Sequence, residues 1–414
     1  MGSGRFHRVL ISSTGTGARR LQTPILVVFL VATAVAVRPA VSASPGRVAS
    51  SPGEVASARD CRTLLARTPA PEGQQPTLPP QRRLLDVVTE FVEHSVPNGQ
   101  RYVFPTEDQR ARFQCGFQYA ATGRFANARR LLQPLQYDVK QFIDTGAAVR
   151  RPLILLEERT STGRDGVARY RHAWGLYVIA ARTVLRALAV EVPHQCKSIA
   201  RCNAVGGDRR THTMAVATFE RARAKYLFVA GTDRGATAIG CARRPCSADV
   251  AHEETSMFEA VHEATLAPSL GSPPAARIFQ PHGFSTGNHP ASCQEAVVSA
   301  GLEQDASPGI ETTRLARRIA AALNADASDV YGRKVLLYGR DVFPRGRPDG
   351  RVDCSPQDDP AGGLGATTNV QGQFAAQLTP ARDFVSVEAS QHVRNLAAQR
   401  DALSETIAEV ISAP

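Results

Sequence analysis

The sequence predicts an α/β protein in which a mixed, largely parallel sheet is flanked by helices. From about residue 150, short apolar runs rich in Val, Leu and Ile alternate with segments whose apolar residues recur at helical spacing. Apolar strands separated by helices are typical of a sheet covered on both faces. Several of these runs end at a proline or glycine, as strands do where they reach the edge of a sheet.

The apolar runs define the expected strands, and helical periodicity defines the expected helices. We expect strands at 152–156, 175–180, 185–192, 226–230, 276–281, 296–300, 334–338 and 384–387. We expect helices at 211–224, 254–266, 312–323, 370–378 and 391–411, and a long loop at 340–366, which is rich in Gly, Pro and Asp.

The first 43 residues have the composition of a secretory signal segment. They contain five arginines and no acidic residue, an apolar run at 25–37, and the small residues Val41-Ser-Ala43 of a cleavage site. The apolar run of about 13 residues is short for a membrane span of roughly 20. We therefore expect a protein that is secreted or associated with the cell envelope and that would stay at the membrane only if the segment were not cleaved.

The remaining chain divides by composition into three parts. Residues 44–82 are rich in Ser, Pro, Gly and Ala and predict a disordered linker. Residues 83–149 predict a small helical region, and residues 150–414 the α/β domain. Within the helical region, Cys115-Gly116 to Ala128 resembles a single tetratricopeptide repeat. One copy indicates either a helical hairpin packed on the main domain or a peptide-docking module.

Charge and cysteine content limit the function classes. The net charge of +11 falls to +6 without the five arginines of the signal segment. No basic run is interleaved with aromatic residues, so we exclude a nucleic-acid partner. Eight cysteines follow the signal segment, and export permits disulfides. Cys196 is close in sequence to Cys202, and Cys241 to Cys246, so each pair could form a local disulfide. The full disulfide connectivity stays open.

Three polar residues stand at the ends of predicted strands. His194 follows Pro193, His282 follows Pro281, and Glu388 follows the strand at 384–387. In open α/β sheets, ligands bind at the carboxyl ends of the strands, so these side chains can converge. Two histidines with a carboxylate are typical of a hydrolytic zinc site, in which a carboxylate near the metal accepts a proton from the attacking water.

These segments resemble a known group of enzymes. Zinc carboxypeptidases and their amidohydrolase relatives have segments similar to Glu191-Val-Pro-His194, Gln280-Pro-His-Gly283 and Val385-Ser-Val-Glu388. These relatives are of the N-formylglutamate amidohydrolase and poly-γ-glutamate hydrolase types. The resemblance implies a carboxypeptidase or phosphorylase/hydrolase-like fold, zinc held by His194 and His282, and Glu388 as the catalytic base.

The carboxylate ligand departs from the family pattern. That pattern places an acid three residues after the first histidine, but position 197 is Lys. Asp208 is the nearest acid downstream, and a disulfide-closed insertion would return it to the metal. Glu191 is the alternative, although strand alternation points it away from His194. A third possibility is that the ligand is missing.

Further polar residues lie close to strand ends. Arg234 is a candidate for binding a substrate carboxylate, with a surface ion pair as the alternative. His252 and Asn369 are candidate substrate-binding residues, although Asn369 also suits a helix cap. The segment His252-Glu-Glu-Thr-Ser256 has serine where a zincin helix has its second histidine, so we reject that motif. His262 suits a packing or supporting role.

We therefore predict a secreted zinc-dependent hydrolase that cleaves an amide bond in a peptide, an acylated amino acid or a γ-glutamyl substrate. One alternative is a catalytically inactive binding protein with the same fold. Another is a serine hydrolase, because Gly283-Phe-Ser285-Thr-Gly287 matches G-x-S-x-G; Pro290 argues against the helix that this motif requires. The oligomeric state is left open.

Overall fold

The computed structural model describes most of the chain after residue 54. The described residues are 55–70, 80–95, 101–148, 150–164, 166, 168–181, 187–196, 208–240, 247–284, 296–301, 311–330, 335–337, 366, 368–378 and 382–413. The predicted signal segment, Ser285, Cys202, Cys241 and Cys246 lie outside them, as does nearly all of the predicted loop at 340–366. None of the helices in these ranges combines the length and apolar character needed to cross a membrane.

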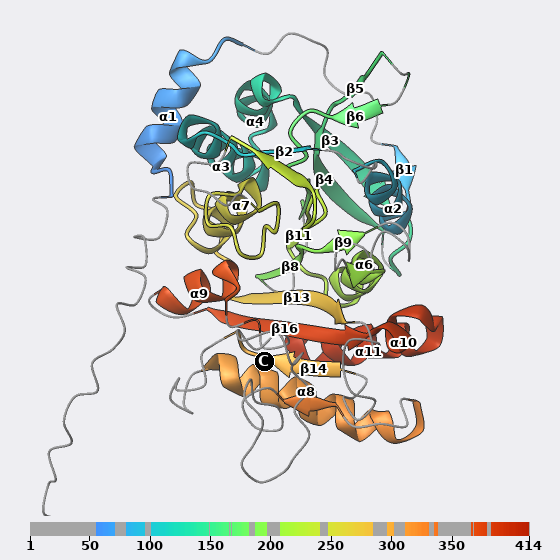
Figure 1. The fold of residues 1–414 in the computed structure, drawn as a ribbon. Helices are drawn as coiled ribbons and strands as arrows, with labels where there is room; N and C mark the ends of the chain where they lie inside the picture. The colour runs from blue at the N-terminus through green and yellow to red at the C-terminus, as the bar shows by residue number, and fades with distance from the viewer. Residues whose placement is uncertain are drawn as a thin grey trace, which may run out of the picture. The chain divides into compact units, whose positions relative to one another are not determined.

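A ten-stranded mixed sheet organises the described chain (Figure 1). In spatial order its strands are β1 (Gln81–Arg82), β3 (Tyr137–Asp144), β4 (Arg151–Glu158), β7 (Leu176–Ala180), β11 (Tyr226–Val229), β8 (Leu188–Val192), β13 (Arg277–Phe284), β16 (Asp383–Ser390), β14 (Ala296–Ser299) and β15 (Leu336–Leu337). The central strands β11, β8, β13 and β16 are mutually parallel. Strands β3, β4 and β7 add antiparallel neighbours on one side, and β14 adds one on the other.

Among the described residues, three short strand pairs lie outside the main sheet. They are β9 (Gln195–Cys196) with β10 (Asp208–Arg209), β2 (Arg101–Val103) with β12 (Thr237–Ile239), and β5 (Thr160–Thr162) with β6 (Ala168–Tyr170). Only the first of them carries a predicted site residue, Asp208.

Helices cover both faces of the sheet, as the apolar strands require. They are α1 (Ala58–Arg67), α2 (Leu84–Ser95), α3 (Glu107–Ala121), α4 (Phe125–Leu132), the 3₁₀ helix η1 (Gln133–Leu135), α6 (Thr211–Arg221), α7 (Met257–Leu266), α8 (Glu311–Val330), α9 (Val370–Gln377), α10 (Gln391–Asn395) and α11 (Ala397–Ser412). Helices α7 and α9 lie to the left of the sheet, and α2, α6 and α11 to the right (Figure 1).

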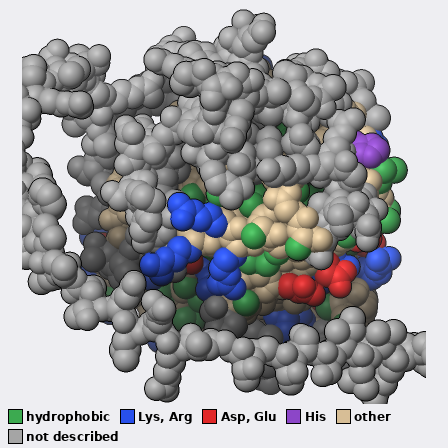
Figure 2. Space-filling model, turned by 90° about the horizontal axis from the view of Figure 1, so that it is seen from below, with side chains coloured by type: hydrophobic (Ala, Val, Ile, Leu, Met, Phe, Trp, Pro, Cys, Tyr) green, Lys and Arg blue, Asp and Glu red, His purple; other side chains and the backbone are tan. Residues whose placement is uncertain are grey.

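Strand alternation divides the hydrophobic core into two clusters. On β8, Val190 belongs to the cluster under α2, α6, α8 and α11, whereas its neighbour Ala189 belongs to the cluster under α1, α3, α4, α7 and α9. Helix α8 buries Leu315 and Ile319 at helical spacing and exposes the arginines between them. On the face seen in Figure 2, Lys and Arg side chains gather beside a smaller acidic group.

The predicted α/β class is confirmed, and each predicted strand overlaps an observed one. Two predictions about elements are wrong. The helix expected at 391–411 is interrupted at Leu396, whose extended backbone separates α10 from α11. The linker expected at 44–82 contains α1, because Ser57 and Asp60 form a capping box and a disulfide joins Cys61 to Cys115 of α3.

The region at 83–149 contains the helical hairpin α3–α4 and also the strand β3, which helical periodicity did not reveal. Gly116 lies where α3 meets α4: a β-carbon there would come within 2.5 Å of Leu132 Cγ. Gly123 turns the chain between the helices with φ of 78°. The proposed domain boundaries at 43, 82 and 149 stay predictions.

Candidate metal centre

His282 and Glu388 are neighbours because β13 and β16 are parallel and in register. Their Cα atoms are paired across the two strands, and both side chains are buried. Residues two apart on a strand share a face, so Gln280 lies on the same face of β13 as His282. Pro281, which lies between them, points to the opposite side. Strand pairing alone therefore brings an imidazole and a carboxylate together.

His194 and Asp208 meet through the short pair of strands β9 and β10. Pro193 ends β8, and the chain leads from His194 directly into β9. Asp208 opens β10, and its backbone amide donates a hydrogen bond of 2.7 Å to the carbonyl of His194. Cys196 is disulfide-bonded, while its expected partner Cys202 lies outside the described residues. The insertion thus returns Asp208 to His194.

Three side chains offer ligand atoms to a common point. One potential ligand atom from each of His194, Asp208 and His282 lies within 4.8 Å of the other two. Asp208 Oδ2 is 3.7 Å from His194 Nδ1 and 3.4 Å from His282 Nδ1, and all three side chains are about 5% exposed or less. Glu388 Oε1 lies 3.9 Å from His282 Nδ1. The cluster is therefore buried and compact.

The imidazole of His194 is oriented by Asp249. Nε2 of His194 lies 2.6 Å from Asp249 Oδ1, and an ionised carboxylate only accepts hydrogen bonds, so Nε2 carries the proton. In the neutral form of the imidazole, Nδ1 is left with a lone pair. It is buried, and no described residue forms a hydrogen bond with it. A buried, unpartnered acceptor is costly, and a metal ion would satisfy it.

The imidazole of His282 is oriented by Gln280. Gln280 Oε1 lies 3.2 Å from His282 Nε2 and also accepts from Asn369 Nδ2 at 2.7 Å. Gln280 Nε2 donates to Glu191 Oε2 at 2.8 Å. This donation fixes the orientation of the Gln280 amide, so its oxygen faces the imidazole. His282 Nε2 therefore donates, and Nδ1 keeps its lone pair on the side of Asp208.

Behind Gln280 lies a buried polar network in which His262 has the supporting role expected from the sequence, whereas the parts played by Gln371 and Glu259 were not predicted. Glu191 Oε1 bonds His262 Nδ1 at 2.7 Å, and both side chains are fully buried. Gln371 of α9 accepts from Gln280 Nε2 at 3.3 Å and donates to Glu259 Oε2 at 2.6 Å. Hydrogen-bonded networks of this kind restrict the orientation of the side chains they contain.

Burial and neighbouring charges shift the pKa values at the site. Burial opposes protonation of His194, but the charge of Asp249 outweighs it and raises the pKa of His194 to about 9. Burial lowers the pKa of His282. Burial also raises the pKa of Glu388 to about 8, and the nearby Asp208 carboxylate acts in the same direction. The hydrogen bonds and charges of the two histidines overcome burial and hold the pKa of Asp208 below its usual range.

The predicted substrate-binding residues lie around Asp249 and Gln280. Arg234 donates to Asp249 Oδ2 through Nη2 at 2.7 Å and Nε at 3.0 Å, and its side chain is 33% exposed. His252 Nδ1 lies 3.1 Å from Asp249 Oδ1, and its side chain is 38% exposed. Asn369 is buried and caps α9 by accepting from Gly372 N, besides donating to Gln280. Arg234 and His252 thus form the accessible rim of the site.

Of the two carboxylates considered as the third ligand, one lies beside the two histidines and the other does not. Asp208 joins the two histidines, whereas Glu191 bonds His262 and Gln280 instead. His194, Asp249 and His252 also lie within 4.8 Å of one another through single atoms. In that group, however, Asp249 already accepts from Arg234 and from His194 Nε2. The first group is therefore the better candidate for a metal site.

Some supporting residues left a signal in the sequence, and others did not. Gln280 precedes His282 by two positions on a predicted strand, which places it on the same face. Asp249 follows Cys241 and Cys246 in the sequence and has no periodic pattern around it. Its contact with His194 spans 55 residues. Only the folded chain reveals such a pairing.

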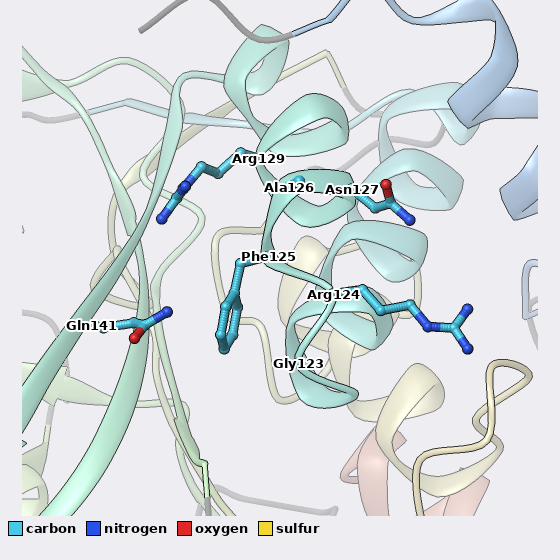
Figure 3. Close-up of a pocket in the computed structure, with 7 residues that line it drawn as sticks. All are labelled: Gly123, Arg124, Phe125, Ala126, Asn127, Arg129 and Gln141. Atoms are coloured by element: carbon cyan, nitrogen blue, oxygen red, sulfur yellow. The ribbon is translucent and has the colours of Figure 1, made fainter. Parts of the chain in front are cut away.

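A separate cavity of about 600 Å³ lies at the helical hairpin. Gly123, Arg124 and Phe125 line it where α4 begins, and Gln141 of β3 faces Phe125 (Figure 3). None of its lining residues belongs to the cluster of His194, Asp208 and His282.

No family model matches the sequence, and no curated protein matches it. Solved structures give alignments at low identity. N-formylglutamate amidohydrolase from Ralstonia eutropha JMP134 aligns at 10% identity with a TM-score of 0.31, covering 55% of this chain and 92% of that one. The Legionella pneumophila LapA aminopeptidase aligns at 9% identity with a TM-score of 0.32, covering 91% and 80%.

A further alignment is with the bottromycin maturation enzyme BotP in complex with Mn, at 12% identity with a TM-score of 0.31, covering 73% of this chain and 71% of that one. We base the functional proposal on the geometry of the site.

Proposed function

We propose that this protein is a zinc-dependent hydrolase of amide bonds. The observation that carries the proposal is the convergence of His194, Asp208 and His282, with Glu388 beside them. Two oriented imidazoles and one carboxylate match the protein ligand set of catalytic zinc sites, which leave a position for water or substrate. The unpartnered Nδ1 of His194 supports the same assignment.

Some side chains of the site would bind the metal ion, and one would take part in proton transfer. His194, Asp208 and His282 would hold the ion, which when bound polarises a carbonyl and makes water more acidic. In its ionised form, Glu388 is placed to accept the proton of the attacking water and to return it to the leaving nitrogen. Asp249 and Gln280 keep the two imidazoles in the tautomer that leaves Nδ1 free.

We assign substrate orientation to the rim of the site. Arg234 is held by Asp249 and remains partly exposed, so it suits a substrate that carries a carboxylate. His252 lies beside it. A peptide with a free carboxyl end, an N-acyl amino acid and a γ-glutamyl chain all have this feature.

We also propose that the protein is exported. The signal-like segment at 1–43 supports this location. The disulfide between Cys61 and Cys115 is compatible with an oxidising compartment.

The test combines metal analysis with turnover of the purified chain. We expect bound zinc at one equivalent and loss of amide hydrolysis on chelation. Glu388→Gln should keep zinc and lose at least about 100-fold in kcat. His282→Ala should lose both zinc and activity. His172→Ala is a matched control, because His172 bonds Glu158 and no residue of the cluster.

Parent protein without zinc above a trace amount would refute the metal site. Hydrolysis that survives chelation would favour the serine mechanism with Ser285. Undiminished turnover in Glu388→Gln would remove Glu388 from the reaction. Substrate class is read from a panel of carboxylate-bearing peptides, N-acyl amino acids and γ-glutamyl peptides, each compared with its amidated counterpart.

A further inference from the structure

Arg394 connects the three segments that carry the site. It lies on α10, immediately after β16, and its side chain is buried. Its guanidinium donates to three backbone carbonyls: Nε to Ala389 at 3.1 Å, Nη1 to Arg209 at 2.5 Å and Nη2 to Phe284 at 3.1 Å. These acceptors belong to β16, β10 and β13, which lie far apart in the sequence.

Each carbonyl is close in sequence to a side chain of the cluster. Ala389 follows Glu388, Arg209 follows Asp208, and Phe284 is two residues after His282. The guanidinium of Arg394 therefore forms hydrogen bonds with the backbone beside two proposed metal ligands, Asp208 and His282, and beside the proposed catalytic base, Glu388. Its charge also interacts favourably with the carboxylates of Asp208 and Glu388.

Gly283 makes room for this arrangement. A β-carbon at that position would lie 2.3 Å from both Cζ and Nε of Arg394, far inside van der Waals contact. The guanidinium thus passes directly over the backbone between His282 and Phe284. Glycine is the residue type that permits so close an approach.

We propose that Arg394 is the positioning residue of the metal centre: it sets the relative positions of Asp208, His282 and Glu388 through the backbone. The proposal rests on the proposed function. Ligand atoms must be held to within about 0.5 Å for strong binding and turnover, and a fork of donors in fixed geometry meets that demand. Lysine has one point charge on a flexible stem and cannot reproduce the three directions.

The experiment compares Arg394→Ala and Arg394→Lys with Arg277→Ala. Arg277 is a matched control, since it also donates to backbone carbonyls, of Ile411 and Ala413, but does so at the opposite end of β13. We measure zinc affinity by chelator competition, kcat and KM separately, and unfolding in urea. All three variants should lose stability.

Only the Arg394 variants should weaken zinc binding, and Arg394→Ala should do so by about 10- to 100-fold. In these variants kcat should fall, whereas KM should change little. Arg394→Lys should recover stability more than zinc affinity. Zinc affinity equal to that of the parent in folded Arg394→Ala would overturn the proposal and leave the proposed function intact. A parent that binds no zinc would overturn both.

A double-mutant cycle with Gly283→Ala provides the second arm. In the parent, Gly283→Ala should displace the guanidinium and weaken zinc binding as Arg394→Ala does. In the Arg394→Ala background, where the space is vacated, Gly283→Ala should add little. Fully additive losses would show that the two residues act separately and would contradict the proposal. If Arg394→Ala fails to fold, Arg394→Lys takes its place in the cycle.

Discussion

At the scale of single residues, the site depends on which imidazole nitrogen carries a proton. Asp249 accepts from Nε2 of His194, and Gln280 accepts from Nε2 of His282. In their neutral forms, both imidazoles therefore present the lone pair of Nδ1 toward Asp208. The two partners differ in kind: a carboxylate can only accept, whereas an amide must itself be oriented. Asn369 and Glu191 provide that orientation.

We predict that Gln280→Leu weakens zinc binding by about 10- to 100-fold, because His282 loses the acceptor that fixes its tautomer and ring position. Chelator competition measures the change. Gln118→Leu is the control, since Gln118 is equally buried and accepts from the backbone of Ser269 and Leu270, not from a site residue. Equal zinc affinity in Gln280→Leu and the control would show that the tautomer is fixed in another way.

At the scale of elements, α3 and α4 form a hairpin packed on the sheet rather than a repeat array. The close crossing at Gly116 and the disulfide from Cys115 to α1 hold this hairpin. Helix α3 also contributes to the buried network next to α7: Arg110 and Gln114 both bond Glu263 Oε2. The hairpin therefore has a structural role in the main domain.

We predict that Gly116→Ala destabilises the protein by about 1–2 kcal/mol, although alanine favours helix, because the added β-carbon overlaps buried Leu132. Urea denaturation measures the change. In a Leu132→Ala background the overlap is gone, and the same substitution should become neutral or stabilising. A loss of equal size in both backgrounds would mean that the crossing is not the cause. Zinc affinity should be unaffected.

At the scale of the whole molecule, stability depends on two cores and on the buried groups between helices and sheet. His212 of α6 is one such group: it is 8% exposed, and its Nδ1 has no hydrogen-bond partner within the described part of the chain. Burial, together with the charges of Arg400 and Arg210, lowers its pKa to about 4. The folded protein therefore holds this histidine neutral where the unfolded chain would protonate it.

We predict that this histidine makes stability depend on pH. Its folded pKa lies below the unfolded value of about 6.5, so the neutral form contributes fully above pH 6.5 and the contribution is lost as pH falls toward 4. The stability difference between the parent and His212→Gln should change by about 3 kcal/mol between pH 7 and pH 4. Other titrating groups cancel in this difference. A difference that does not vary with pH would contradict the prediction.

Much of the fold was accessible from local pattern, because periodicity records which face of an element is buried. The eight strands expected after residue 150 are present, and His194, His282 and Glu388 lie where the ends of parallel strands meet. Strand β3 was missed because its apolar residues are interspersed with polar ones within a region of helical character. Helix α1 was missed because its flanks have the composition of a linker.

The sequence by itself determined the α/β class and the strand-end positions of two histidines and a glutamate, since these follow from spacing along one chain. Tertiary structure alone decided that Asp208, and not Glu191, completes the cluster, because a two-residue strand pair returns it to His194. It also decided the contacts of Gln280, Asp249 and Arg394. These join segments far apart in the sequence, and no local periodicity encodes which distant backbone a side chain will reach.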